Sequence, residues 1–248
     1  MSTSVVLITG ALTGIGRAAA VAFAQKGAKL VAAGRHDEAG KELVDELRGL
    51  GAEAEFVNAD VRKEDDVRAL VDAAVSRFGR LDAAVNAAGT EGRPGPFAEQ
   101  SAESYAATFD TNVLGTLLSV KHELRVMQAQ GSGSIVNISS TYGHEGGAGA
   151  AVYVASKHAV EGMTKSAALE AASSGVRVNA VAPGPVQTGM LDRFTGTPDR
   201  KAALLTTVPL GRVGDTDEIA QAAVFLASDA ASFITGEILN VDGGKSAG

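Results

Sequence analysis

The sequence of 248 residues contains no cysteine. This absence excludes a disulfide-stapled scaffold, a thiolate metal site and a cysteine nucleophile. A chain of this length needs no such staple, because folding can remove roughly 70% of its extended surface from water. The lack of cysteine also suits a reducing compartment, and we expect a cytoplasmic protein.

Basic residues are fewer than acidic ones, 22 against 29, which leaves a net charge of −7. An acidic chain without a basic cluster is a poor ligand for nucleic acid. The segment from Met1 to Ser4 has no basic residue, and the apolar run behind it ends at Thr9-Gly10. That run is too short for a signal-peptide core or a membrane span. No two of the four histidines lie close together in the sequence, and we expect no metal site and no nucleic-acid or membrane partner.

Glycine is abundant: it makes up 30 of the 248 residues, whereas a usual share of about 7% would give about 17. The glycines lie at the ends of short apolar runs, and these runs alternate with helical stretches. Strands are predicted at 5–8, 29–33, 53–57, 81–86, 135–139, 176–181 and 237–241, and helices at 14–26, 37–49, 63–78, 101–130, 150–173 and 216–228. This alternation predicts an α/β fold, a parallel sheet covered by helices on both faces. With no composition break, residues 1–248 form one domain in this prediction.

A glycine-rich segment, Thr9 to Gly16, lies between the first predicted strand and the first predicted helix. A phosphate group can approach the N-terminal amides of a helix only where no side chain obstructs it. The segment therefore predicts a phosphate-binding loop for a dinucleotide. The alternative is an ordinary tight turn between a strand and a helix.

Tyr153 and Lys157 are four residues apart on a predicted helix, so they share one face, about 6 Å apart along the axis. A nearby ammonium favours the phenolate, which predicts a fall in the pKa of the tyrosine from about 10. Ser139 and Ser140 end the fifth predicted strand, where parallel sheets bind ligands. Asn112 lies within a predicted helix, although asparagine is a mediocre helix former. Taken singly, each of these residues also has a purely structural explanation.

Together, and in this order along the chain, these motifs resemble those of the short-chain dehydrogenase/reductase family. The resemblance covers essentially the whole sequence. Its further motifs are Asp60-Val61, Asn86-Ala87-Ala88-Gly89, Pro183-Gly184 and Asp242-Gly243-Gly244. Ala87 departs from the pattern, because many members of the family have a second asparagine there.

The resemblance implies a Rossmann-type doubly wound parallel sheet of about seven strands and a set of catalytic roles. Tyr153 exchanges a proton with the substrate oxygen, and Lys157 lowers the pKa of the tyrosine and binds the nicotinamide ribose. Ser140, rather than Ser139, polarises the carbonyl, and Asn112 supports a water that links Lys157 to solvent. The hydride passes directly between the nicotinamide and the carbonyl carbon. The residues that the resemblance implies for cofactor binding are Gly10, Thr13, Gly14, Ile15, Gly16, Arg35, Asp60, Val61, Asn86, Ala87, Gly89, Tyr153, Lys157, Pro183, Gly184, Val186 and Thr188.

The end of the second predicted strand indicates which nicotinamide cofactor binds. NAD-specific relatives usually carry an acidic residue there for the ribose hydroxyls, but this chain has Gly34. Arg35 follows and can bind a 2′-phosphate through two hydrogen bonds. Thr13 lacks the basic side chain that some NADP enzymes place in the loop. The sequence favours NADP(H), with NAD(H) as the alternative.

Residues 183–213 give the most information about the substrate. They are rich in Pro, Gly and Thr and show little periodicity, which is typical of a long loop or lid. Its apolar residues Met190, Leu191 and Phe194 either wall the substrate pocket or pack beneath the lid. Other candidates for the pocket are Thr141, Tyr142, His144 and Pro185. For His144 we favour a surface position.

These features predict an oxidoreductase that transfers a hydride between NADP(H) or NAD(H) and a ketone or secondary alcohol. The nearest alternative is a 3-oxoacyl thioester reductase that acts on an acyl carrier protein. A dinucleotide-binding regulator without turnover is a third hypothesis, which the presence of all four catalytic positions opposes.

The helices at 150–173 and 101–130 predict an oligomer. On a helical wheel, Lys157, His158, Glu161 and Lys165 form a narrow polar arc, and the opposite surface is small or apolar. That surface contains Ala155, Ala159, Val160, Gly162, Met163, Ala167 and Leu169, and the second helix adds Val113, Leu114, Leu117, Leu118 and Val120. Relatives pair these two helices across a two-fold axis, so we expect a homotetramer, with a dimer as the alternative.

Overall fold

A seven-stranded parallel sheet forms the centre of the molecule in the computed structural model, which describes residues 4–247. Two stretches lie outside the described residues, Met1–Thr3 and Gly248. Met1–Thr3 belongs to the segment that we predicted to be no signal peptide. The strand order is β3-β2-β1-β4-β5-β6-β7. Every neighbouring pair is parallel, which confirms the predicted α/β doubly wound fold.

The strands lie within two residues of their predicted bounds. They are β1 (Val5–Thr9), β2 (Lys29–Gly34), β3 (Ala54–Asn58), β4 (Ala83–Asn86), β5 (Gly133–Ile138), β6 (Val176–Pro183) and β7 (Ile238–Val241). All five residues of β1 are buried, because the sheet is covered on both faces. Val6 and Ile8 belong to one hydrophobic core and Leu7 to the other, as the alternation of side chains along a strand requires.

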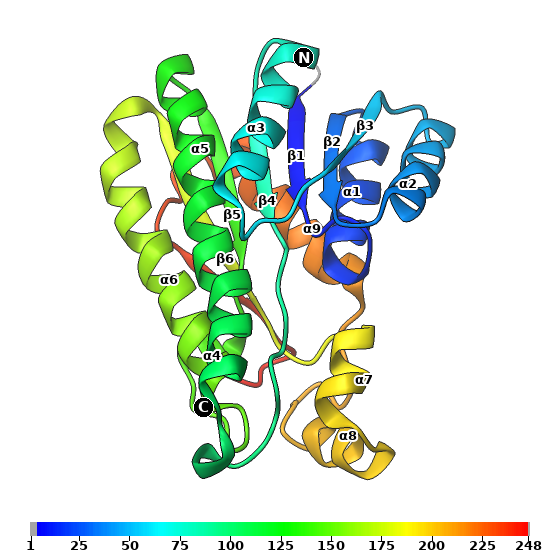
Figure 1. Ribbon diagram of the computed structural model, residues 1–248, viewed down its shortest axis with the longest axis vertical. Helices are drawn as coiled ribbons and strands as arrows, with labels where there is room; N and C mark the ends of the chain where they lie inside the picture. Colours follow the sequence, from blue (N-terminus) through cyan, green and yellow to red (C-terminus); the bar gives the residue numbers. More distant parts are fainter. Residues whose placement is uncertain (1–3, 248) are drawn as a thin grey trace.

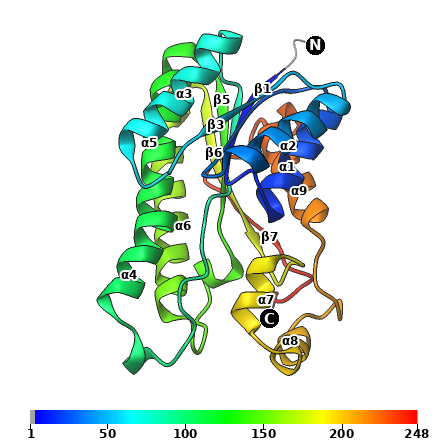
Figure 2. The ribbon, with the colours of Figure 1, turned by 45° about the vertical axis from the view of Figure 1, so that its right-hand side comes forward.

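Helices cover both faces of the sheet (Figures 1 and 2). One layer contains α1 (Gly14–Gln25), α2 (Asp37–Gly49) and α9 (Thr216–Ala227). The other contains α3 (Glu64–Phe78), α4 (Ala102–Phe109), α5 (Gly115–Gln130) and α6 (Ala151–Ala171). Short 3-10 turns occupy η1 (Phe97–Glu99), η3 (Thr141–Gly143), η4 (Ala172–Ser174) and η5 (Asp229–Ala231). Within residues 4–247, no helix combines the length and the apolar character that crossing a membrane requires.

Two elements differ from the prediction. The single helix expected at 101–130 is interrupted between α4 and α5 by a π-helical turn, η2 (Asp110–Leu114), and Asn112 lies in this turn. The segment 183–213, expected to be a loop, contains α7 (Gly189–Thr195) and α8 (Pro198–Leu205). Thr188 and Thr197 cap these helices, but each helix is too short to show an apolar period in the sequence. In Figures 1 and 2 they lie apart from the two helical layers.

The four residues of the polar arc predicted for the helix at 150–173 differ in burial. Lys157 and Glu161 are buried, at 5% and 4% exposure, because they face the loops that follow the strands. His158 and Lys165 are exposed, as are Gly162 and Leu169 on the surface predicted to be apolar. The exposed face of α6 therefore carries small and apolar residues as well as charged ones.

Candidate active site

A cleft of about 580 Å³ lies where the carboxyl ends of the strands meet the lid helices α7 and α8. The strand order reverses between β1 and β4, and such a reversal is where open α/β sheets bind ligands. We call the part of the cleft lined by Gly10, 12–16, 33–36, 59–61 and 87–89 the nucleotide end. The part lined by Glu91, 139–142, 185–186, 188–191, 193–194, Leu204 and Lys245 is the substrate end.

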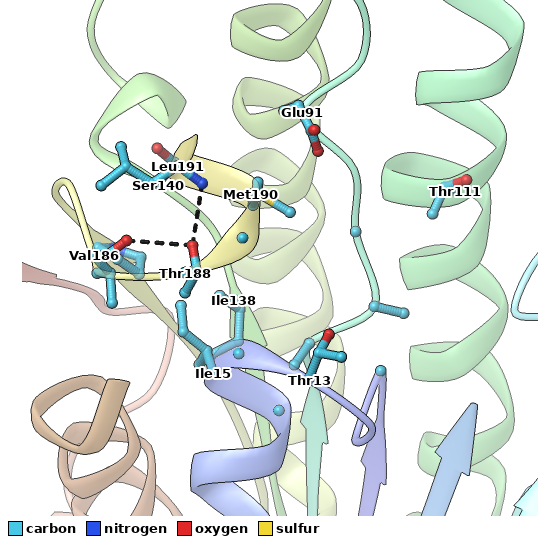
Figure 3. A pocket seen from close by; sticks show the side chains of 18 of the residues that line it. Thr13, Ile15, Glu91, Thr111, Ile138, Ser140, Val186, Thr188, Met190 and Leu191 are labelled. Carbon is cyan, nitrogen blue, oxygen red and sulfur yellow. Dashed lines mark hydrogen bonds between the residues drawn. The ribbon is translucent and has the colours of Figure 1, made fainter. Parts of the chain in front are cut away.

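The glycine-rich loop packs so tightly that two of its glycines cannot be replaced. Gly10 has a φ of +65°, and a Cβ there would lie 2.7 Å from the backbone of Ala88. A Cβ on Gly16 would lie 2.3 Å from the carbonyl oxygen of Gly10. The loop thus closes against the turn after β4 and presents the N-terminus of α1 to the cleft, the arrangement that a pyrophosphate requires (Figure 3).

The far part of the nucleotide end carries one basic and one acidic side chain, those of Arg35 and Asp60. Arg35 lines the cleft, and among residues 4–247 it forms no ion pair and no side-chain hydrogen bond. Asp60 accepts hydrogen bonds from Arg62, at 2.9 Å from Nε to Oδ1, which lowers the pKa of the carboxyl to about 2. The negative charge of Asp60 is therefore balanced by its own neighbour, and the guanidinium of Arg35 is free for an anion.

Tyr153, Ser140 and Lys157 meet at the junction of the two ends. Lys157 Nζ donates to the carbonyl oxygen of Ile138 at 2.8 Å and lies 5.7 Å from the centroid of the Tyr153 ring. Burial raises the pKa of Tyr153 to about 12, although a hydrogen bond with Ser140 acts in the opposite direction. Burial also lowers the pKa of Lys157 to about 8. The predicted fall in the tyrosine pKa is thus wrong for this structure, because desolvation disfavours the phenolate more than its neighbours stabilise it.

Asn112 lies beside this group but does not line the cleft. Its Nδ2 donates to the carbonyl oxygen of Thr90 at 2.9 Å and to Ser156 Oγ at 3.0 Å, and its Oδ1 accepts from the Thr90 amide at 2.8 Å. Ser156 Oγ in turn donates to the carbonyl oxygen of Tyr153 at 2.7 Å. The Asn112 amide therefore joins the loop after β4 to the helix that carries Tyr153. The water that the resemblance implies at this residue stays a prediction.

Asn86 lies beneath the cleft in a buried polar network and not in the cleft lining. Its Nδ2 donates to Glu123 Oε2 and to Asn137 Oδ1, both at 3.0 Å. Glu123 is fully buried, and desolvation raises its pKa to about 7. Within the described chain, Asn86 Oδ1 and Glu123 Oε1 have no hydrogen-bond partner. Glu123 was not among the residues predicted from the sequence, although a lone carboxylate among the apolar residues of 113–127 was a usable signal.

The substrate end has aromatic and aliphatic walls. The Tyr142 ring lies 6.3 Å from that of Tyr153 and 6.2 Å from that of Phe194, between centroids. The candidates that line the cleft are Thr141, Tyr142, Pro185, Met190, Leu191 and Phe194. His144 does not line it: this residue is exposed, and its Nδ1 lies 3.0 Å from Glu161 Oε1. Four further residues of the lining were not predicted from the sequence, because they reach the cleft from segments far apart in the chain: Glu91, Arg193, Leu204 and Lys245.

The lining of the cleft contains nearly all the residues that the resemblance implies for cofactor binding. The cofactor candidates that line it are Gly10, Thr13, Gly14, Ile15, Gly16, Arg35, Asp60, Val61, Ala87, Gly89, Tyr153, Lys157, Pro183, Gly184, Val186 and Thr188. Thr188 is held by hydrogen bonds to Val186 and Leu191 (Figure 3). No group of three or more potential metal ligands occurs in residues 4–247.

Comparisons with known proteins indicate the family of this chain. The family described as "Enoyl-(Acyl carrier protein) reductase" matches residues 10–246. An A-factor type gamma-butyrolactone 1'-reductase (1S-forming) from Streptomyces virginiae is 44% identical over 98% of this chain and 96% of its own. A 3-oxoacyl-[acyl-carrier-protein] reductase from Thermotoga maritima is 39% identical over 97% and 96%.

Solved structures show the same likeness. Levodione reductase superposes with a TM-score of 0.96 and 35% identity over 98% of both chains. ElxO, solved with NADP bound, gives a TM-score of 0.93 and 34% identity over 99% of this chain and 100% of its own. The dinucleotide cleft, the Tyr153–Lys157 pair and these full-length similarities lead to one conclusion: the chain belongs to the short-chain dehydrogenase/reductase family and is a nicotinamide-dependent oxidoreductase.

Proposed function

We propose that the enzyme interconverts a small, uncharged ketone and the corresponding secondary alcohol, with NADP(H) as its preferred cofactor. The observation that carries this proposal is the position of Tyr153 and Ser140. Their hydroxyl groups meet at the junction of the nucleotide end and the apolar substrate end, with Lys157 behind them. Two hydroxyl donors aimed at one place suit a carbonyl oxygen that gains negative charge during reduction.

The chain's own residues supply the proton and the orientation. The nicotinamide ring supplies the hydride in reduction and accepts it in oxidation. Tyr153, with a pKa of about 12, stays protonated at neutral pH and can donate its Oη proton to the substrate oxygen. Ser140 donates a hydrogen bond to the same oxygen, and the Lys157 ammonium stabilises the phenolate that remains. Asn112 fixes the helix and the loop on which this geometry depends.

The preference for NADP(H) rests on charge. Arg35 lines the nucleotide end and forms no ion pair within the part of the chain that the structure describes, and Gly34 replaces the carboxylate that would repel a 2′-phosphate. An aspartate at position 34 would also collide with Leu12, because a Cβ there lies 2.5 Å from Leu12 Cδ1. ElxO, the relative solved with NADP, supports the same choice. The test is a titration of the protein with NADPH and NADH: tighter binding of NADPH is expected, and equal or tighter binding of NADH would refute the preference.

A 3-oxoacyl thioester is the second candidate substrate, because a relative with 39% identity is named as a reductase of that class. Initial rates with NADPH separate the candidates, with cyclic and branched ketones in one series and a 3-oxoacyl thioester in the other. We expect the higher kcat/KM for the ketones, since the substrate end is walled by the rings of Tyr142 and Phe194. A higher kcat/KM for the thioester would select the alternative. Binding of NADPH without oxidation by any substrate would indicate a regulator.

We also propose a homotetramer in the cytoplasm. Leu114 and Leu117 are exposed on η2 and α5, at 37% and 50%, and Phe233 is fully exposed after η5. Two separate apolar surfaces match the two kinds of two-fold interface in a tetramer of dihedral symmetry. Light scattering should give about 100 kDa, four times 25.1 kDa, and the variants Leu117→Glu and Phe233→Glu should each give a dimer. A mass near 25 kDa for the wild type would refute the assembly.

A further inference from the structure

An ion pair crosses the substrate end of the cleft. Arg193 Nε lies 2.5 Å from Glu91 Oε1, and Arg193 Nη2 lies 3.1 Å from Glu91 Oε2. Both side chains line the cleft, and 102 residues of sequence separate them. Two parallel bonds between a guanidinium and a carboxylate fix orientation as well as distance. In Figure 3, Glu91 lies on the segment that follows β4, whereas Met190 and Leu191 belong to α7.

The Glu91 side of the pair is rigid. Glu91 is only 8% exposed, and the residue before it, Thr90, is held by Asn112 through both its amide and its carbonyl group. Asn112 also binds Ser156 on α6, the helix that carries Tyr153. The carboxylate of Glu91 is therefore anchored to the same framework as the catalytic tyrosine.

The Arg193 side belongs to the lid, which has few other ties. Among the described residues, the two bonds to Glu91 are the only side-chain hydrogen bonds that join 189–205 to segments outside 183–213. The other side-chain bonds of α7 and α8 stay within the lid, such as Lys201 to Asp192 at 2.9 Å. Met190, Leu191 and Phe194 lie on α7 with Arg193, so the position of this ion pair decides where the apolar wall stands.

We propose that Glu91 and Arg193 form a latch that holds α7 over the substrate end, which makes both of them positioning residues that determine substrate binding. The proposal rests on the proposed function, since it assigns the lid side of the cleft to the ketone or alcohol. Neither residue exchanges a proton with the substrate in this account.

The latch also affects the proton chemistry, because Glu91 is one of the groups that face Tyr153. Those groups are Ser140 after β5, Tyr142 on η3 with Lys245 over its ring, Lys157 on α6 with Glu161 behind it, and Glu91 after β4. The negative charge of Glu91 raises the pKa of Tyr153, and the guanidinium of Arg193 offsets that charge. Loss of Arg193 should therefore raise the pKa of Tyr153 further, whereas loss of the Glu91 charge should lower it.

Two single variants and one control test the latch. Glu91→Gln and Arg193→Met should each raise KM for the ketone about tenfold, because each removes a hydrogen bond between charged groups. The Kd of NADPH should stay unchanged in both variants. The double variant should add little to either single change, because both remove the same interaction. Asp192→Asn breaks the Asp192–Lys201 pair, which lies within the lid and away from the cleft, and should leave KM within twofold. KM values within twofold for the two latch variants would overturn the proposal.

The pH profile of alcohol oxidation separates positioning from general damage. The pH of half-maximal rate should fall in Glu91→Gln and rise in Arg193→Met, although both variants open the same contact. A variant that only loosened the fold would not move the two profiles in opposite directions. Shifts in one direction, or no shift, would contradict the coupling.

The rate of hydrogen exchange at the backbone amides of 189–195 measures how firmly α7 is held, and the measurement needs no enzymatic turnover. Exchange should be faster in both latch variants than in the wild type and unchanged at β1, which does not contact the lid. If the wild type turns over no ketone or alcohol, the proposed function fails, and faster exchange still establishes the latch. Unchanged exchange in both variants would overturn the latch, whatever the activity shows.

Discussion

The two ends of the cleft are built in different ways. The nucleotide end consists mainly of backbone at the carboxyl ends of β1, β2, β3 and β4, held by the ladder of the sheet and by close packing of Gly10 and Gly16. The substrate end consists of α7, α8 and side chains, and it is joined by ion pairs between distant segments, Glu91–Arg193 and Glu145–Lys245. A binding site made of backbone accepts few changes in its ligand, because single substitutions hardly alter its shape. A binding site made of side chains changes its shape with each substitution. This difference matches a constant cofactor and a variable substrate.

Substitution of Tyr153, at the junction of the two ends, should have the largest effect. Tyr153→Phe removes only the hydroxyl, so the fold and the Kd of NADPH should be retained while turnover falls about 10²- to 10⁴-fold. Steady-state rates and a fluorescence titration with NADPH measure the two quantities on one sample. Turnover within threefold of the wild type would remove Tyr153 from the mechanism.

A second test concerns the buried network under the nucleotide end. The pKa of Glu123 is about 7 in the folded protein, against 4.5 for an unperturbed carboxyl group. Between these values the unfolded chain binds fewer protons than the folded one, so the free energy of unfolding falls as pH rises, by roughly 3 kcal/mol from this residue. Glu123→Gln stays neutral and should abolish this part of the pH dependence.

Urea unfolding at pH 5 and pH 8 checks this expectation. The loss of stability between the two values should be smaller for Glu123→Gln than for the wild type. Glu170→Gln, on the exposed side of α6, is the matched control and should follow the wild type. An equal loss in Glu123→Gln would show that Glu123 does not hold its proton in the folded state.

Cofactor choice depends on a single side chain at the far part of the nucleotide end. Arg35→Ala should weaken NADPH binding about 10- to 150-fold, because it removes a charge-assisted hydrogen bond to the 2′-phosphate. Binding of NADH should change by less than threefold. Thr13, which lines the same end without a charge, provides Thr13→Ala as a control for general damage to the loop. Equal losses for the two cofactors in Arg35→Ala would show that Arg35 does not face the phosphate.

The smallest effect is expected at the substrate end. Phe194→Ala should raise KM for a cyclic ketone by a few-fold and leave the Kd of NADPH unchanged, because it shortens one wall of the substrate pocket. The contrast with Arg35→Ala, which alters the cofactor and not the ketone, sharpens the separation of the two ends. If Phe194→Ala weakened NADPH and the ketone alike, the two ends would not be independent.

The nucleotide end could be predicted from the sequence because its signals are local. A buried strand, a glycine-rich turn and a helix follow one another within Val5–Gln25, and the structure contains these elements. The strands elsewhere also lie within two residues of the prediction, since apolar runs and turn glycines mark their ends. Tyr153 and Lys157 lie on one helix as predicted, and their four-residue spacing on the predicted helix at 150–173 indicated a shared face.

The substrate end and the electrostatics could not be predicted in the same way. Glu91 and Arg193 meet only in the folded chain, and no local pattern relates positions 102 residues apart. The burial of Lys157 and Glu161 could not be predicted, because a helical wheel shows spacing and not which side of the helix the sheet and loops cover. The rise in the pKa of Tyr153 depends on burial, which the packing of the folded chain decides and no local sequence pattern indicates.

Transfer of deuterium tests the central claim most directly, that the cleft brings a reduced nicotinamide to a ketone beside Tyr153. The wild type and Tyr153→Phe are incubated with a cyclic ketone and NADPH that carries deuterium on both positions of the reactive nicotinamide carbon, and the alcohol is analysed by mass spectrometry and NMR. We predict one deuterium on the carbinol carbon and none on the hydroxyl oxygen after work-up in ordinary water, with product nearly absent in Tyr153→Phe. Alcohol formed without deuterium on that carbon, or formed equally well by the variant, would contradict the account.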